Sequence, residues 1–187
     1  MPLEQDMINI LQNQKTRQIS FSFTSSVGGT VTVNYSTFQR IIQGLQNNRF
    51  EVTDQGAPPG GAAYNPNSSI AGRSGRFKLN PTGGVQAAFE SLVVHESVHA
   101  SFDLTRSTLP WVDNEAAAHI AQGYYYYLSN VSPNIITFEP VRIARQLAEY
   151  IADSGFMHGQ NLQELRNPLL AAQPYQRYIH GTSTGNG

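Results

Sequence analysis

The sequence predicts an α+β fold in which the strands come first and the helices follow. Up to about residue 53, apolar and polar residues alternate with the period of half-buried strands, whereas from Gly83 the apolar residues recur at helical spacing. The chain has 187 residues, the size of one ordinary domain. We therefore expect a single domain over residues 1–187, with a β-rich lobe at 1–106 and a helical lobe at 107–180, the helices grouped at one side of an antiparallel or mixed sheet.

The first strands are predicted from strict alternation. Apolar residues alternate with Ser and Thr over residues 19–24, a glycine-containing turn follows at 25–29, and residues 30–35 alternate again. This pattern is typical of a β-hairpin. Ser36 is then expected to cap a helix with apolar residues at helical spacing, and residues 50–53 are expected to form a short third strand.

Residues 54–76 hold five glycines and three prolines. That composition favours a long loop or a glycine-bent edge strand, because both residue types interrupt regular pairing. Long loops in compact domains are usually functional or disordered.

The second half of the chain has the periodicity of helices. Helices are predicted at about residues 83–104, 113–129, 139–154 and 162–172. The tail 181–187 has almost no apolar content, and we expect it to be disordered.

Charge and composition exclude several classes of function. Lys and Arg total 12 and Asp and Glu total 13, so no electrostatic argument favours a nucleic-acid or anionic-membrane partner. The chain has no cysteine, which excludes a disulfide scaffold, a cysteine-based zinc site and a thiol nucleophile. No apolar run is long enough for a membrane helix, and Met1–Asp6 lacks the basic start and apolar core of a signal peptide. We expect no membrane insertion, and a location that is cytoplasmic or reached by a leaderless export route.

The strongest motif is His95-Glu96-Ser97-Val98-His99, which matches H-E-x-x-H. With 5 His and 8 Glu in the chain, accidental matches are expected on the order of 0.006 times. On a helix, positions i and i+4 lie on one face, so both imidazoles can reach the same ion. The predicted helix is otherwise apolar nearly all round, so it is buried, and its polar side chains need partners. The alternative is a pair of core histidines bonded to backbone carbonyls.

Zinc with an open catalytic position normally takes three protein ligands, so a third is required. Glu115, at the start of the next helix, is the leading candidate, and the small residues after it allow two helices to approach closely. Its carboxylate is alternatively a first-turn acid favoured by the helix dipole. His119 and Asp103 are the other candidate ligands.

These residues resemble the gluzincin metallopeptidases, the thermolysin-like branch of the zincins. Their pattern is H-E-x-x-H on one helix and N-E-x-x-[AS] on the next, and here Asn114-Glu115 begins the second motif. The resemblance covers about residues 60–128. It implies a zincin-like fold, one Zn²⁺ per chain held by His95, His99 and Glu115, and Glu96 as general base. An extended peptide or protein substrate would then lie along a strand in residues 61–79.

The chain departs from the family pattern in its outer groups. Thermolysin-like enzymes have an acid four residues after the glutamate ligand, where this chain has His119. The acid that orients a zinc histidine is expected to be Asp103 or Asp113 instead. No residue matches the family's downstream transition-state histidine. The candidates for that role are His119, His158, His180, Tyr150 and the run Tyr124–Tyr127, of which Tyr126 shares a helix face with Glu115.

The sequence therefore predicts a zinc-dependent metallopeptidase that cleaves peptide bonds with metal-activated water. Two alternatives remain. One is a metal-binding module without catalysis that acts in protein interaction, and the other is an effector or toxin protease with one narrow protein target.

Overall fold

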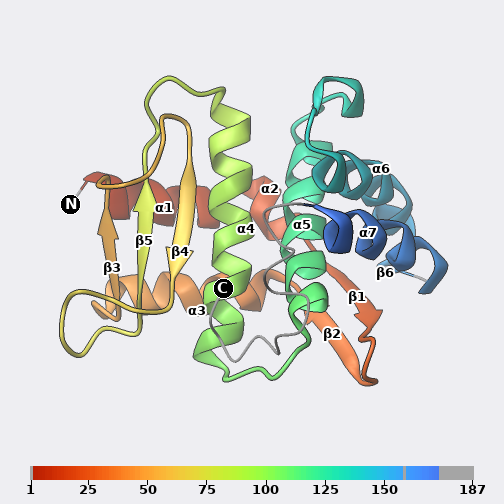
Figure 1. Cartoon of the computed structure of the whole chain (residues 1–187). Coiled ribbons are helices and arrows are strands. Elements are labelled where there is room, and N and C mark those ends of the chain that lie inside the picture. Colours follow the sequence, from red (N-terminus) through yellow and green to blue (C-terminus); the bar gives the residue numbers. More distant parts are fainter. Residues whose placement is uncertain (1, 158, 173–187) are drawn as a thin grey trace.

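In the computed structural model, which describes residues 2–157 and 159–172, the chain forms seven α-helices, six strands and one 3-10 helix (Figure 1). In chain order these are α1 (Pro2–Gln12), α2 (Gln14–Gln18), β1 (Phe21–Thr24), β2 (Thr30–Val33), α3 (Tyr35–Gln46), β3 (Phe50–Thr53), β4 (Ala62–Asn65), β5 (Gly75–Leu79), α4 (Gln86–Leu104), α5 (Trp111–Leu128), η1 (Pro133–Ile135), α6 (Glu139–Ser154), β6 (Phe156–Met157) and α7 (Gly159–Ala171). The predicted α+β class is confirmed.

One sheet lies beside α4 and has the strand order β3-β5-β4. The central strand β5 is parallel to β3 and antiparallel to β4. Its alternate residues Phe77 and Leu79 are buried together with Phe50 of β3. The glycine-rich stretch therefore supplies an edge strand, β4, which contacts α4 along its outer side.

The second sheet has the order β2-β1-β6 and contains the predicted hairpin. In the hairpin, Phe21 is paired with Val33 and Phe23 with Val31, all four buried. The short strand β6 pairs in parallel with β1, so the hairpin lies with α5, α6 and α7 and not with β3–β5 (Figure 1). The strands of the first 53 residues thus belong to two sheets.

Two N-terminal helices were not predicted. Helix α1 buries Met7 and Leu11, and α2 begins after Asn13, whose side chain accepts a hydrogen bond from the Thr16 N–H. The signal was present in the apolar spacing of Leu3, Met7 and Leu11, one helical turn apart each time.

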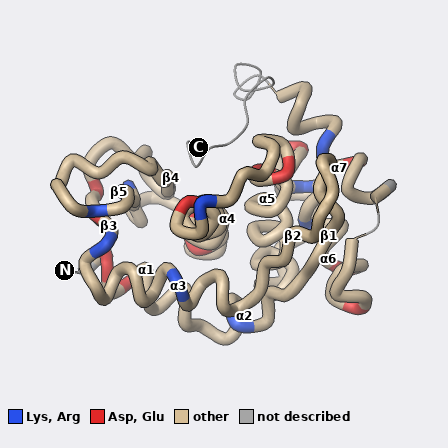
Figure 2. Tube along the Cα trace, turned by 90° about the horizontal axis from the view of Figure 1, so that it is seen from below, with Lys and Arg blue, Asp and Glu red and all other residues tan. Residues whose placement is uncertain are grey.

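The helices α4 and α5 form the centre of the molecule. Figures 1 and 2 agree that α4 lies between β4 on one side and α5 on the other. Ala116, Ala117 and Ala118 of α5 are fully buried, and their small side chains let the two helices approach closely. Helix α6 packs against α5 at Gly123, where a Cβ atom would collide with the backbone of Ala144.

The four predicted helices of the second half are confirmed as α4, α5, α6 and α7, with bounds shifted by a few residues. The tail at 181–187, expected to be disordered, lies outside the described residues. Among the helices that the structure describes, none combines the length and apolar character needed to cross a membrane.

Candidate metal centre

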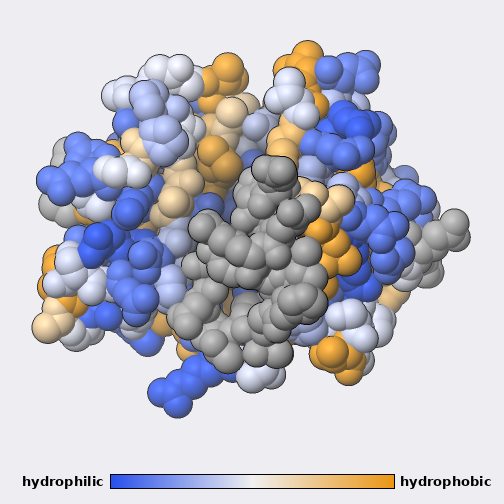
Figure 3. Space-filling model, viewed as in Figure 1, coloured by the Kyte–Doolittle hydropathy of each residue, from blue (hydrophilic) through white to orange (hydrophobic). Residues whose placement is uncertain are grey.

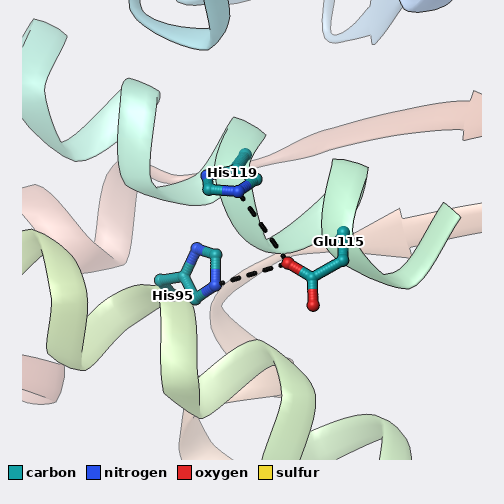
Figure 4. A group of neighbouring side chains, drawn as sticks. All are labelled: His95, Glu115 and His119. Atoms are coloured by element: carbon teal, nitrogen blue, oxygen red, sulfur yellow. Dashed lines mark ion pairs between the residues drawn. The ribbon is translucent and has the colours of Figure 1, made fainter. Parts of the chain in front are cut away.

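The two central helices face each other with a pair of potential metal ligands on each. Helix α4 carries His95 and His99, and α5 carries Glu115 and His119, each pair separated by one helical turn. All four side chains are buried, with exposed fractions of 2–7%. Figure 4 shows that His95 and His119 each direct a ring nitrogen towards the same oxygen of the Glu115 carboxylate.

The donor atoms lie close enough to share one ion. His95 Nε2 lies 3.0 Å from His99 Nε2, and His99 Nε2 lies 3.6 Å from Glu115 Oε1. Glu115 Oε2 lies 3.8 Å from both His95 Nε2 and His119 Nε2. Ligands about 2.0–2.1 Å from a tetrahedral ion are separated from one another by about 3.3 Å. Only small shifts would therefore bring neighbouring donors onto one ion.

The structure brings a third histidine, His119, into the group of candidate ligands. Donor atoms of His95, Glu115 and His119 all lie within 4.8 Å of one another, and these three residues form a buried group that could hold a metal ion. His99, expected as a ligand with His95 and Glu115, contacts both of them. His119, which was an alternative ligand on the sequence alone, thus lies in the centre itself.

Two amide side chains orient the imidazoles. The Oδ1 atom of Asn114 lies 2.7 Å from His99 Nδ1, and the Oε1 atom of Gln122 lies 3.3 Å from His119 Nδ1. A carbonyl oxygen can only accept, so both Nδ1 atoms donate, and in the neutral ring each Nε2 atom keeps its lone pair. Sequence reasoning missed both amides. Their signal was position: Asn114 precedes Glu115, and Gln122 follows His119 by three residues on the same helix face.

The groups that orient the imidazoles are therefore amides, and not the acid expected at Asp103 or Asp113. Asp113 instead binds Ser25, Ser26 and Arg166. Asp103 lies one turn beyond His99 on α4. Burial raises its pKa to about 6, against smaller lowering effects of Tyr64 and His99.

The electrostatics favour neutral rings at His95 and His119. Burial lowers the pKa of His95, and the neighbouring histidines lower it further. Burial, with His99, lowers the pKa of His119 to about 3. Burial also acts to lower the pKa of His99, but the nearby carboxylates of Glu115 and Glu96 more than offset this and raise it. Neutral imidazole is the form that binds metals.

Glu96 lies beside the ligand groups and is held by the edge strand. Its Oε2 atom accepts a hydrogen bond of 2.8 Å from the backbone N–H of Tyr64 in β4. Desolvation raises the pKa of Glu96 to about 7, with Glu115 adding to this, while His99 and the Tyr64 N–H oppose it.

A cavity of about 480 Å³ opens beside this centre. Glu96, His95 and His119 form its polar wall, together with Gln122 and Tyr126. The remaining lining is mostly apolar and includes Val85, Leu92, Ile135, Ile136, Phe138 and Val141. Val85 and Ile135 are exposed at its rim, and Figure 3 shows hydrophobic residues on both sides of the hollow at the top of the molecule.

The other transition-state candidates are distributed differently. Tyr126 lines the cavity, whereas Tyr150 lies on α6 with 47% of its surface exposed and is absent from the cavity wall. Tyr125 is fully buried and donates a hydrogen bond of 2.7 Å to Glu90. His158 and His180 lie outside the described residues.

The charged residues give no second functional signal. In Figure 2 the positions of Lys and Arg are scattered over the part of the chain that the structure describes, without a basic face. Comparison of the chain with known protein families, with curated proteins and with solved structures found no match.

Proposed function

We propose that the chain is a zinc-dependent hydrolase that cleaves peptide bonds, with a zincin-like arrangement of ligand helix and edge strand. The observation that carries this proposal is the position of the Glu96 carboxylate. Its carboxylate lies on the wall of a cavity, beside the metal-ligand groups but outside the group of donors. A metal site that only stabilises the fold has no need of such an acid.

The residues fit zinc. Three imidazole nitrogens with one carboxylate oxygen suit zinc better than calcium or magnesium, which prefer oxygen ligands alone. His95, Glu115 and either His99 or His119 would supply the three protein ligands of a catalytic site. When bound, zinc polarises a substrate carbonyl and lowers the pKa of water to about 7.

Glu96 is suited to moving the proton in this reaction. Its Oε2 atom accepts the Tyr64 N–H, so Oε1 is the atom that takes the proton from the attacking water and passes it to the leaving amine. A general base works best when its pKa lies near the working pH, and the pKa of Glu96 is raised to about 7. Tyr126, on the same cavity wall, is the candidate to stabilise the charge that develops on the carbonyl oxygen.

The substrate is an extended peptide or protein segment. Strand β4 is an edge strand, and Ala62 directs its backbone groups to the side away from β5, the same side on which the Tyr64 N–H binds Glu96. A substrate strand can pair with such an edge. The apolar cavity beside Glu96 accommodates one bulky apolar side chain of that segment.

The test compares wild type with Glu96→Gln on a diverse peptide library read by mass spectrometry. We expect unchanged zinc content and stability and at least about a hundredfold less cleavage, the low end for loss of a general base. Glu90→Gln is the matched control, since Glu90 lies on the same helix but its carboxylate binds Tyr125. Cleavage by Glu96→Gln at the wild-type rate would refute the mechanism.

One observation favours a second candidate, a metal-binding module without catalysis. Four protein groups surround the centre, and structural zinc sites are closed by four protein ligands. Zinc-loaded wild type that binds a protein partner and cuts no peptide in the library would favour this module.

A further inference from the structure

The potential ligands form a closed ring around the centre. His95 Nε2 lies 3.0 Å from His99 Nε2, which lies 3.6 Å from Glu115 Oε1. Glu115 Oε2 lies 3.8 Å from His119 Nε2, and the His119 ring lies 4.5 Å from the His95 ring, measured between centroids. Each helix thus supplies two neighbours in the ring.

The ring concentrates electron pairs at its centre. Asn114 and Gln122 hold the Nδ1 hydrogens of His99 and His119, so the lone pairs of both Nε2 atoms are directed towards the Glu115 carboxylate. An imidazole lone pair and a carboxylate repel each other at this distance unless a proton or a metal cation lies between them. His119 faces the Glu115 carboxylate as His99 does, so nothing in the geometry reserves coordination for the H-E-x-x-H pair.

His119 is held in this position by its own helix. Glu115 and His119 are at i and i+4 on α5, as His95 and His99 are on α4, so each pair lies on one helix face. His119 has an exposed fraction of 2% and lies in the wall of the apolar cavity.

We propose that His119 is the fourth protein ligand of the ion in the free protein, so that His95, His99, Glu115 and His119 close the coordination sphere. This inference rests on the metal site of the proposed function and assigns its regulation. A catalytic zinc site keeps one position open, whereas four protein ligands leave none. Hydrolysis then requires His119 to leave the ion, and an apolar side chain that enters the cavity contacts this residue directly.

The first measurement is X-ray absorption spectroscopy of zinc-loaded wild type and His119→Ala. We expect a shell with three imidazoles in wild type and two in the variant. Chelator competition should show zinc binding weakened at least about tenfold in the variant, since a ligand is lost and not an outer contact. Leu92→Ala is the matched control, because Leu92 lines the same cavity without a donor atom. It should keep three imidazoles and wild-type affinity.

Cobalt-substituted protein gives an independent signal. The visible absorption of Co²⁺ should change in His119→Ala and return towards the wild-type spectrum when free imidazole is added, because imidazole can occupy the vacated position. Two imidazoles in wild type, or a variant with wild-type spectrum and affinity, would overturn the assignment of His119 and leave the proposed function intact. A wild type that takes up no zinc would overturn both. The wild-type imidazole count decides the question even if the variant does not fold.

Discussion

At the scale of single residues, the centre depends on amides that hold the imidazoles. Asn114 lies at 5% exposure, and its Oδ1 atom is 2.7 Å from His99 Nδ1. Hydrogen bonds of this kind fix the tautomer and the direction of a metal-binding ring. The side chain at position 114 should therefore affect the affinity for metal as strongly as some of the ligands do.

We expect Asn114→Leu to weaken zinc binding by about 10–100-fold, the usual effect of losing such a partner. Asn114→Asp is the control, since it keeps an oxygen acceptor at the same position and should retain most of the affinity. Chelator competition monitored by a zinc-sensitive dye measures both. Equal affinities for Leu and Asp at this position would show that the hydrogen bond has no orienting role.

Helical spacing places His95 and His99 on one face of their helix, and the family resemblance adds Glu115; the structure brings these three side chains together. The sequence could not weigh His119 against His99, because that depends on how α4 and α5 are offset along each other. Asn114 and Gln122 were missed since amides carry no charge signal and occur throughout this chain. Asp113 was one of two alternatives for the orienting acid, but its side chain is directed to the hairpin and α7.

At the scale of elements, the close contact of α5 and α6 depends on one glycine. A Cβ atom at Gly123 would collide with the backbone of Ala144, and backbone cannot move aside as a flexible side chain can. Helix periodicity predicted both helices, but it contains no information on where two helices cross. The same limit applies to residues 54–76, for which the sequence favours either a long loop or an edge strand. Only the pairing of β4 with β5 distinguishes the two.

Gly123→Ala should destabilise the protein by about 1–3 kcal/mol, the usual cost of overpacking, although alanine favours helices. Gly159→Ala is the control, because a Cβ atom added at Gly159 would meet no other atom within 4 Å and its backbone angle φ is not positive. Urea unfolding followed by circular dichroism compares the two. A Gly123→Ala protein as stable as Gly159→Ala would contradict the tight crossing of α5 and α6.

At the scale of the whole molecule, Asp113 connects segments that are distant in the sequence. Its side chain is fully buried and accepts hydrogen bonds from Ser25 and Ser26 of the hairpin turn. On its other oxygen it accepts a hydrogen bond of 2.8 Å from Arg166 of α7. The start of α5, which carries Asn114 and Glu115, is thus attached to the second sheet and to the last helix.

Arg166→Leu should reduce the stability by about 3–5 kcal/mol, because it leaves a buried carboxylate without its cation. The double variant Asp113→Asn with Arg166→Leu should recover part of this loss, since the uncompensated charge is removed. Thermal unfolding of the four proteins of this cycle measures the coupling. If the two substitutions changed the stability additively, the side chains of Asp113 and Arg166 would not be coupled.

The hydrogen bond from the Tyr64 N–H to Glu96 makes the direction of the proposed base depend on how β4 is paired with β5. Tyr64 stands opposite Phe77, and neighbouring residues of a strand direct their N–H groups to opposite sides. A slip of one residue would turn the Tyr64 N–H towards β5 and leave Glu96 without its donor. Insertions and deletions in the surface loop between β4 and β5 are thus tolerated only when this pairing survives. A strand that carries none of the candidate metal ligands would in this way restrict which changes in length the protein can accept.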